Sequence, residues 1–269
     1  MLRAPFPPEE GLRLRRRETA NPAAHDLYLR GLEGLRTGRV ETVQSAQRAF
    51  TRASELDAKF APAFEGLALA LLQGQQTGGD PGASLAGAQR AAEQALVLDD
   101  SLAGARSVLA RALAGQRQYD RAIAEAERAI QLAPNLADSH AHLAMILAWA
   151  GAPEAAVPRM QRAMRLNPTP PYWYLFGMGH AQFLLQKYDN AVAALRRSLQ
   201  VSADYAPARV YLAAAYTQGG KRDMAQFELQ RPDVRMVVPA YASGEQAPYR
   251  NPESLVLLQD SLRKAGLSR

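Results

Sequence analysis

The feature that most constrains this chain is a pattern of residues 103–135 that recurs without a gap at residues 137–169. Leu109 of the first copy corresponds to Leu143 of the second, which gives a period of 34 residues. In each copy, apolar and small residues recur at helical spacing in two stretches separated by a break. A unit of this size cannot bury its apolar side alone, so several units must stack. The sequence therefore predicts a helical-repeat fold.

The residue types in each copy suit close packing between neighbouring helices. Ala122, Ala126 and Ala129 follow one another at i, i+4 and i+7, so they share one side of a helix, where small side chains allow another helix to approach. Pro134 and Pro168 stand where the second helix of each copy should stop, because proline lacks the backbone donor. The breaks and the period therefore agree.

The period and this pattern of small and large residues resemble the tetratricopeptide repeat, or TPR. The resemblance implies an all-α fold, a right-handed superhelical solenoid of about six helix-turn-helix repeats. We predict a linker at 1–20, a solenoid at 21–230, and an irregular segment with a capping helix at 231–269. The predicted repeats cover about residues 22–58, 61–100, 103–136, 137–170, 171–205 and 206–230.

Local signals refine where helices begin and end. Asn135 and Thr169 are predicted to cap helices at their N-termini, and Gly151 is predicted to end one with a positive φ. Asn251 followed by proline predicts the start of the closing helix, over Pro252 to Ala265. Breakers in QGQQTGGDPG, residues 73–82, exclude a continuous helix there.

Composition is consistent with an all-α chain. Of the 269 residues, 48% are hydrophobic and only 7% aromatic, and alanine and leucine dominate. There is no cysteine, which excludes disulfides and thiolate metal sites. No apolar stretch approaches the length of a membrane span, and MLRAPFPPEE lacks the apolar core of a secretory signal. We therefore expect a cytoplasmic chain without membrane contact.

The positive charge is a weak argument for nucleic acid. The 32 basic residues exceed the 26 acidic ones by only six, and the two kinds alternate along the chain. Two arginine clusters stand out: Arg13, Arg15, Arg16 and Arg17, and a second one of Arg159, Arg162 and Arg165. Both are expected to be solvated, although an acidic partner or nucleic acid is the alternative.

Several phrases resemble the C-terminal TPR region of bacterial class III adenylate/guanylate cyclase-like signalling proteins. They are AHDLYLRG, AEQALVLDDSLAGA, DRAIAEAERAIQLAPN, YWYLF and the ending YRNPESLVLLQDSLRKAGLSR, and the likeness covers roughly residues 10 to 269. In that family the region follows a cyclase or DNA-binding head. No metal-binding aspartate pair or nucleotide-recognition residue occurs before residue 20. The resemblance thus implies a regulatory, partner-binding portion and carries over no catalytic residue.

Nothing in the sequence predicts catalysis or a cofactor. The histidines are His25, His140, His142 and His180, and His140 and His142 are two residues apart, so they cannot chelate a metal from one helix face. The GGDPG sequence lacks the lysine of a phosphate-binding loop. We expect no enzyme activity, no cofactor and no metal.

If the function is binding, the TPR resemblance implies a concave groove lined by the first helix of each repeat. The predicted groove residues are Arg111, Met145, Trp173, Phe176, His180 and Phe183. Only Arg111 and His180 approach the basic pattern of repeats that capture an acidic C-terminus, so an apolar peptide or helix of another protein, or an associated signalling domain, is the expected partner. The alternative is that the aromatic residues are inter-repeat core.

Overall fold

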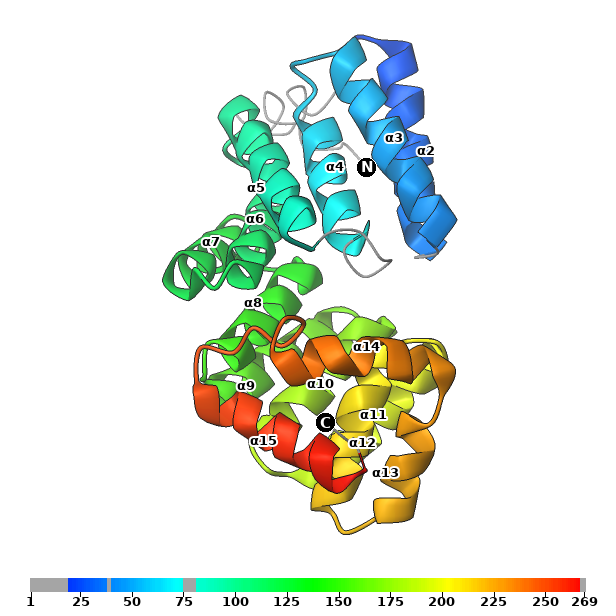
Figure 1. Ribbon diagram of the computed structural model, residues 1–269. Coiled ribbons are helices and arrows are strands. Elements are labelled where there is room, and N and C mark those ends of the chain that lie inside the picture. The colour runs from blue at the N-terminus through cyan, green and yellow to red at the C-terminus, as the bar shows by residue number, and fades with distance from the viewer. Residues whose placement is uncertain (1–18, 38–39, 75–80, 267–269) are drawn as a thin grey trace, which may run out of the picture. The chain divides into compact units, whose positions relative to one another are not determined.

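The computed structural model describes residues 19–37, 40–74 and 81–266, and every regular element in these ranges is an α-helix (Figure 1). The predicted all-α helical-repeat class is confirmed. The helices up to residue 229 are α2 (Pro22–Thr37), α3 (Val40–Leu56), α4 (Ala61–Gly74), α5 (Pro81–Leu98), α6 (Ala103–Gly115), α7 (Tyr119–Leu132), α8 (Ala137–Trp149), α9 (Pro153–Leu166), α10 (Tyr172–Leu184), α11 (Tyr188–Val201), α12 (Ala206–Gln218) and α13 (Arg222–Leu229). The arginines at 13–17 and most of the glycine-rich insertion lie outside the described residues.

Successive helices form pairs, as a helix-turn-helix repeat requires. Contacts join α2 to α3, α4 to α5, α8 to α9, α10 to α11 and α12 to α13. One small residue stands at the same place in the second helix of each of these five pairs, and in α7, and is buried with at most 1% of its surface exposed: Ala46, Ala88, Ala122, Ala156, Ala191 and Ala225. Because these side chains are small and buried in a close-packed interior, they allow the paired helices to approach closely.

The chain divides into two compact units, Met1–Gln116 with Glu127–Pro134, and Arg117–Ala126 with Asn135–Arg269. In the first unit the ring of Phe50 is fully buried and fills the space that Gly31 of α2 and Gly66 of α4 leave open. A Cβ atom at Gly31 would lie 2.6 Å from the ring, so these glycines are required for the approach. Phe50 thus belongs to one of several small apolar clusters in this unit, and another contains Phe60.

The second unit has one continuous apolar core that runs from α8 to the end of the described chain. After α13 the sequence predicts an irregular segment, and the structure corrects this: residues 232–243 form helix α14 (Pro232–Ser243). Val234, Val238 and Tyr241 form a buried stripe on it that packs against α12. Proline is favourable at the start of a helix, and burial of this stripe outweighs the second proline inside it. The prediction gave the prolines too much weight.

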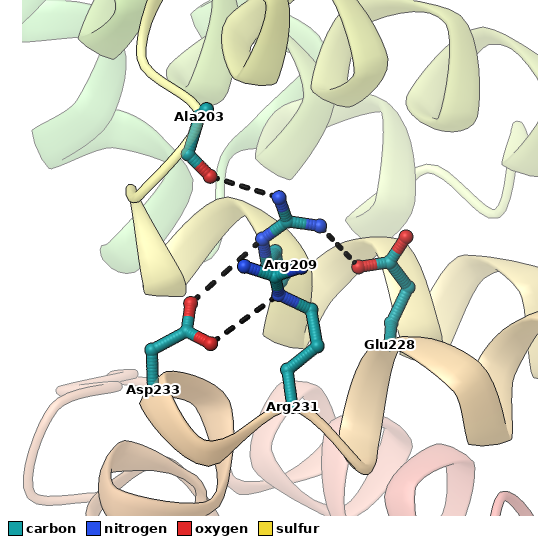
Figure 2. Close-up of polar contacts among 5 residues, drawn as sticks. All are labelled: Ala203, Arg209, Glu228, Arg231 and Asp233. Carbon is teal, nitrogen blue, oxygen red and sulfur yellow. Dashed lines mark hydrogen bonds and ion pairs between the residues drawn. The ribbon is translucent and has the colours of Figure 1, made fainter.

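An ion cluster holds the start of α14 (Figure 2). Arg209 of α12 donates from Nη1 to Glu228 Oε2 at 2.7 Å and from Nη2 to the carbonyl oxygen of Ala203 at 2.8 Å. Asp233 of α14 lies 3.9 Å from Nε of Arg209, and its other oxygen lies 3.3 Å from Nε of Arg231. The cluster therefore ties α12, α13 and α14 together at one point.

The last helix, α15 (Pro252–Lys264), begins where the sequence predicts. Asn251 caps it, with its side-chain oxygen accepting from the backbone N–H of Glu253 at 2.9 Å. Leu258 and Leu262 are fully buried, and α15 covers α12. Figure 1 shows α14 and α15 on the same side of the second unit, in orange and red.

Of the other predicted helix ends, one is confirmed and two are wrong. Gly151 has a φ of +89° and ends α8, as expected. The caps at Asn135 and Thr169 are wrong, because α8 starts after Leu136 and α10 after Pro171, and neither of these residues has a side-chain cap. Extended backbone at these two positions starts each helix without help from a polar side chain.

Candidate functional site

The candidate site is the side of the second unit formed by α8, α10 and α12, the first helices of three pairs, which we call the first-helix face. Its centre is aromatic. The ring of Tyr211 on α12 lies 5.7 Å from those of Phe176 and Phe183 and 4.9 Å from that of His180, all three on α10. Edge-to-face pairs at such distances add to the energy of burial. These rings thus form one continuous, buried aromatic cluster.

A stretch of the same chain covers this face. Residues 244–266, here called the closing segment, leave α14 at Gly244, where φ is +85°, and continue through α15. The hydroxyl of Tyr249 in this segment lies 2.7 Å from Nε2 of His180 and 2.7 Å from the hydroxyl of Tyr211. All three side chains are buried. A tyrosine of the closing segment is therefore held by two polar groups that the face itself supplies.

Burial shapes the ionisation of this trio. It lowers the pKa of His180 to about 3, because the charged imidazolium would be cut off from water. Burial also raises the pKa of the Tyr211 and Tyr249 hydroxyls well above the usual value. The ring of His180 is therefore neutral and both phenols keep their protons, so the trio is joined by neutral hydrogen bonds.

Backbone contacts hold the closing segment on either side of Tyr249. Arg117, just before α7, donates from Nη1 to the carbonyl oxygen of Tyr249 at 3.3 Å and from Nη2 to that of Gly244 at 3.2 Å. The backbone N–H of Arg250 donates to the carbonyl oxygen of Trp149 at 2.8 Å. These bonds recognise a main chain rather than particular side chains.

The side chain of Arg250 extends the attachment to the start of α7. Its Nη2 lies 2.8 Å from an oxygen of Asp120, and its guanidinium lies 5.2 Å from the centre of the Tyr119 ring. The carboxylate of Asp120 is 85% exposed, so solvent weakens this ion pair. The contact of the Arg250 guanidinium with the Tyr119 ring contributes a stabilising free energy of similar size.

The predicted groove residues are not all together. Arg111 lies on α6 and belongs to the first unit, whereas the other five belong to the second. Met145 is 8% exposed, and Trp173 is partly exposed and stacks on His142 at 4.9 Å between ring centres. Phe176, His180 and Phe183 are buried, with 5%, 0% and 0% of their surface exposed. Partner binding through these residues stays a prediction.

Sequence reasoning missed three tyrosines. Tyr211 lies on the first-helix face itself, and Tyr241 and Tyr249 lie over it. Tyr249 does belong to the YRNP phrase that opens the chain ending used for the family resemblance. A tyrosine and an arginine directly before a helix cap were the signal that this stretch makes specific contacts. No comparable signal marked Tyr211, which stands in an alanine-rich helix.

A hollow lies between α11 and α13, over α12. It measures about 610 Å³. Met224 and Phe227, with 45% and 66% of their surface exposed, stand at this hollow. The rest of its lining mixes apolar and charged side chains: Arg196, Leu199, Gln200, Arg209, Leu212, Tyr216, Asp223 and Glu228.

Within the described ranges, no group of three or more histidine, aspartate or glutamate side chains could hold a metal ion. Among the same residues, no helix has both the length and the apolar character needed to cross a membrane.

Comparison with family models places the Tetratricopeptide repeat model on residues 103–136 and 174–205. The chain contains tetratricopeptide repeats. The two matched stretches correspond to α6 with α7 and to α10 with α11. A comparison with curated proteins gives no match.

Solved TPR structures share the fold. A chain of the APC/C hetero-tetramer Cut9-Hcn1 aligns with a TM-score of 0.62 and 18% identity over 89% of this chain, which spans only 46% of that one. The thermophilic TPR protein TTC0263 of Thermus thermophilus gives 0.58 and 18% over 72% of this chain and 98% of its own. PilF of Pseudomonas aeruginosa gives 0.54 and 19%, over 81% and 97%. At these identities the likeness concerns the TPR fold alone.

Proposed function

We propose that this chain is a non-catalytic protein-interaction module that binds a peptide or helix of a partner on the first-helix face of its second unit. The observation that carries the proposal is the closing segment itself. A stretch of polypeptide is seated on this face through an aromatic side chain, main-chain hydrogen bonds and an apolar helix. These are the elements by which proteins recognise peptides.

The groove prediction fits this proposal in its chemistry. Met145, Trp173, Phe176, His180 and Phe183 all belong to α8 and α10, which contribute to the face. Trp173 is the aromatic residue of this group that solvent reaches. It is therefore the position from which a partner can first be detected.

The experiment places a photo-crosslinking amino acid at Trp173 in the full chain and, as a matched control, at Arg162 on the exposed side of α9. After irradiation in cells of the native host, the proposal expects one protein crosslinked at position 173 and absent at 162. The purified candidate should then lose affinity for a Trp173→Ala variant by about tenfold and none for Arg162→Ala. Equal affinity for both variants would remove the first-helix face from the proposal.

We further propose that the module is the regulatory TPR portion of a cyclase-like signalling protein, on the likeness of phrases such as YWYLF and of the ending YRNPESLV. Reading the native locus upstream of Met1 tests this. A cyclase or DNA-binding head in the same or the adjacent reading frame supports the signalling role, and unrelated neighbours on both sides count against it.

Nucleic-acid binding is a second candidate, because Arg159, Arg162 and Arg165 are all exposed on α9 and no ion pair joins any of them to another residue of the described ranges. Such binding would weaken steeply as salt is raised. A gel-shift titration at low salt with the full chain and with a triple alanine variant decides the matter. Absence of any complex ends this candidate.

A further inference from the structure

We propose that the closing segment, residues 244–266, is a displaceable ligand of the first-helix face, and that the partner competes with the same chemistry: a tyrosine followed by a short helix with an apolar side. This inference rests on the proposed function of the face, whose partner and regulation it specifies. In the structure the chain occupies its own binding face.

The recognition of a tyrosine is specific. The imidazole of His180 and the hydroxyl of Tyr211 both meet one atom, the hydroxyl oxygen of Tyr249, at 2.7 Å. A purely apolar side chain in that place would leave both buried polar groups without this partner, which is costly in a low-dielectric interior. The face therefore selects an aromatic ring that carries a hydroxyl.

The recognition of the stretch around that tyrosine is independent of sequence. Arg117 donates to the carbonyl oxygens of Gly244 and Tyr249, and the carbonyl oxygen of Trp149 accepts from the next backbone N–H, that of Arg250. Any polypeptide in the same conformation offers these groups. A partner needs only the tyrosine and a helix start to reproduce the arrangement.

The helix contributes apolar area and few specific bonds. Leu258, Leu262 and Ala265 are buried, with at most 1% exposed, while Gln218 of α12 donates to the hydroxyl of Ser261 at 2.8 Å. Leucine, leucine and alanine at i, i+4 and i+7 form a stripe that many amphipathic helices carry. The face therefore requires a certain chemistry of its occupant and leaves most of the occupant's sequence free.

The position of the closing segment in the chain allows it to leave. α14 before it is tied to the repeats by Arg209, Glu228 and Asp233, so the repeats keep their last partner helix when the segment opens at Gly244. Glu245 in that turn is exposed. Ordering the segment costs conformational entropy that offsets part of what its burial contributes. Partner binding is then a competition for one face.

The experiment cuts the turn in the full chain. A protease site is inserted at Glu245, and the purified protein is cleaved so that both parts stay together without a covalent link. A fluorescent synthetic peptide of residues 245–266 is added, and its anisotropy is followed. We expect the cleaved protein to exchange its own segment for the peptide, and the uncleaved protein to bind none.

Two matched peptides test the chemistry. The Tyr249→Ala peptide should bind the cleaved protein at least about tenfold more weakly, and the Tyr249→Phe peptide should fall between it and the parent. Circular dichroism before and after cleavage reports whether the helices remain.

Three results would overturn the inference: equal peptide binding before and after cleavage, no exchange at a large excess of peptide, or loss of helical signal on cleavage. The last would mean that the segment is an inseparable part of the fold. None of these measurements needs the partner. A partner that fails to bind the face would count against the proposed function and leave the exchange result standing.

Discussion

The hydroxyl oxygen of Tyr249 lies 2.7 Å from Nε2 of His180, a residue 69 positions earlier in the chain. This bond joins the stretch after α14 to the middle of α10, and both residues are buried. Through this bond the C-terminal part of the described chain packs as a component of the second unit. The first two predictions concern this pair.

Replacing Tyr249 by phenylalanine should destabilise the protein by about 1–3 kcal/mol, because the ring stays while His180 and Tyr211 lose their shared partner. Urea denaturation followed by circular dichroism measures the free energy of unfolding. Tyr188→Phe is the control, since no hydrogen bond joins the Tyr188 hydroxyl to any of the described residues. Equal stability of the two variants would show that the trio contributes little.

Acidification should destabilise the protein through His180. Its pKa is about 3 in the folded protein against 6.5 in the unfolded chain, so the unfolded state binds the proton first. The contribution is complete above about pH 6.5 and is lost as the pH falls toward 3, at up to about 1.4 kcal/mol per pH unit. Urea midpoints between about pH 7 and about pH 5 should fall less steeply for His180→Gln. Parallel profiles would exclude His180 as the source.

Removing Arg209 should be costly, because it leaves the Glu228 carboxylate buried without its partner. The two side chains are only 12% and 11% exposed, so we expect Arg209→Ala to lose about 3–5 kcal/mol in thermal or urea unfolding. The pair of Arg263 and Asp260 is 58% and 41% exposed, and Arg263→Ala should cost at most about 1 kcal/mol. A similar small loss for both would mean that water reaches the Arg209 cluster.

Phe183 should behave as a core residue. It is fully buried beside Tyr188 and Tyr211, so Phe183→Ala opens a cavity and should cost about 3–5 kcal/mol. Trp173→Ala, at a partly exposed position, should cost clearly less. Differential scanning calorimetry of both variants checks this order. The reverse order would place Trp173 in the core and Phe183 on the surface.

The repeat architecture could be predicted from the sequence because it depends on local patterns. Small residues such as Ala122 and Ala156 recur at a fixed period, and helices pack on their neighbours in the chain, so near-range spacing contains most of the information. Asn251 could be assigned as a helix cap for the same reason. The helix at 232–243 was missed because its apolar stripe competes with two prolines over a short span.

The cover of the first-helix face could not be predicted, because it depends on contacts between distant residues. Whether His180 faces solvent or Tyr249 is decided by how the chain turns at Gly244, and no periodicity encodes that turn. Position within a repeat indicated the helix face on which Phe176 and His180 lie. It did not indicate that another part of the chain lies over them.

The order of synthesis gives the closing segment a further role. A ribosome makes the chain from its N-terminus, so α8 and α10 can emerge before residues 244–266 exist. Throughout that interval the aromatic side of the second unit is open, and a protein or chaperone present at the ribosome meets it without a competitor.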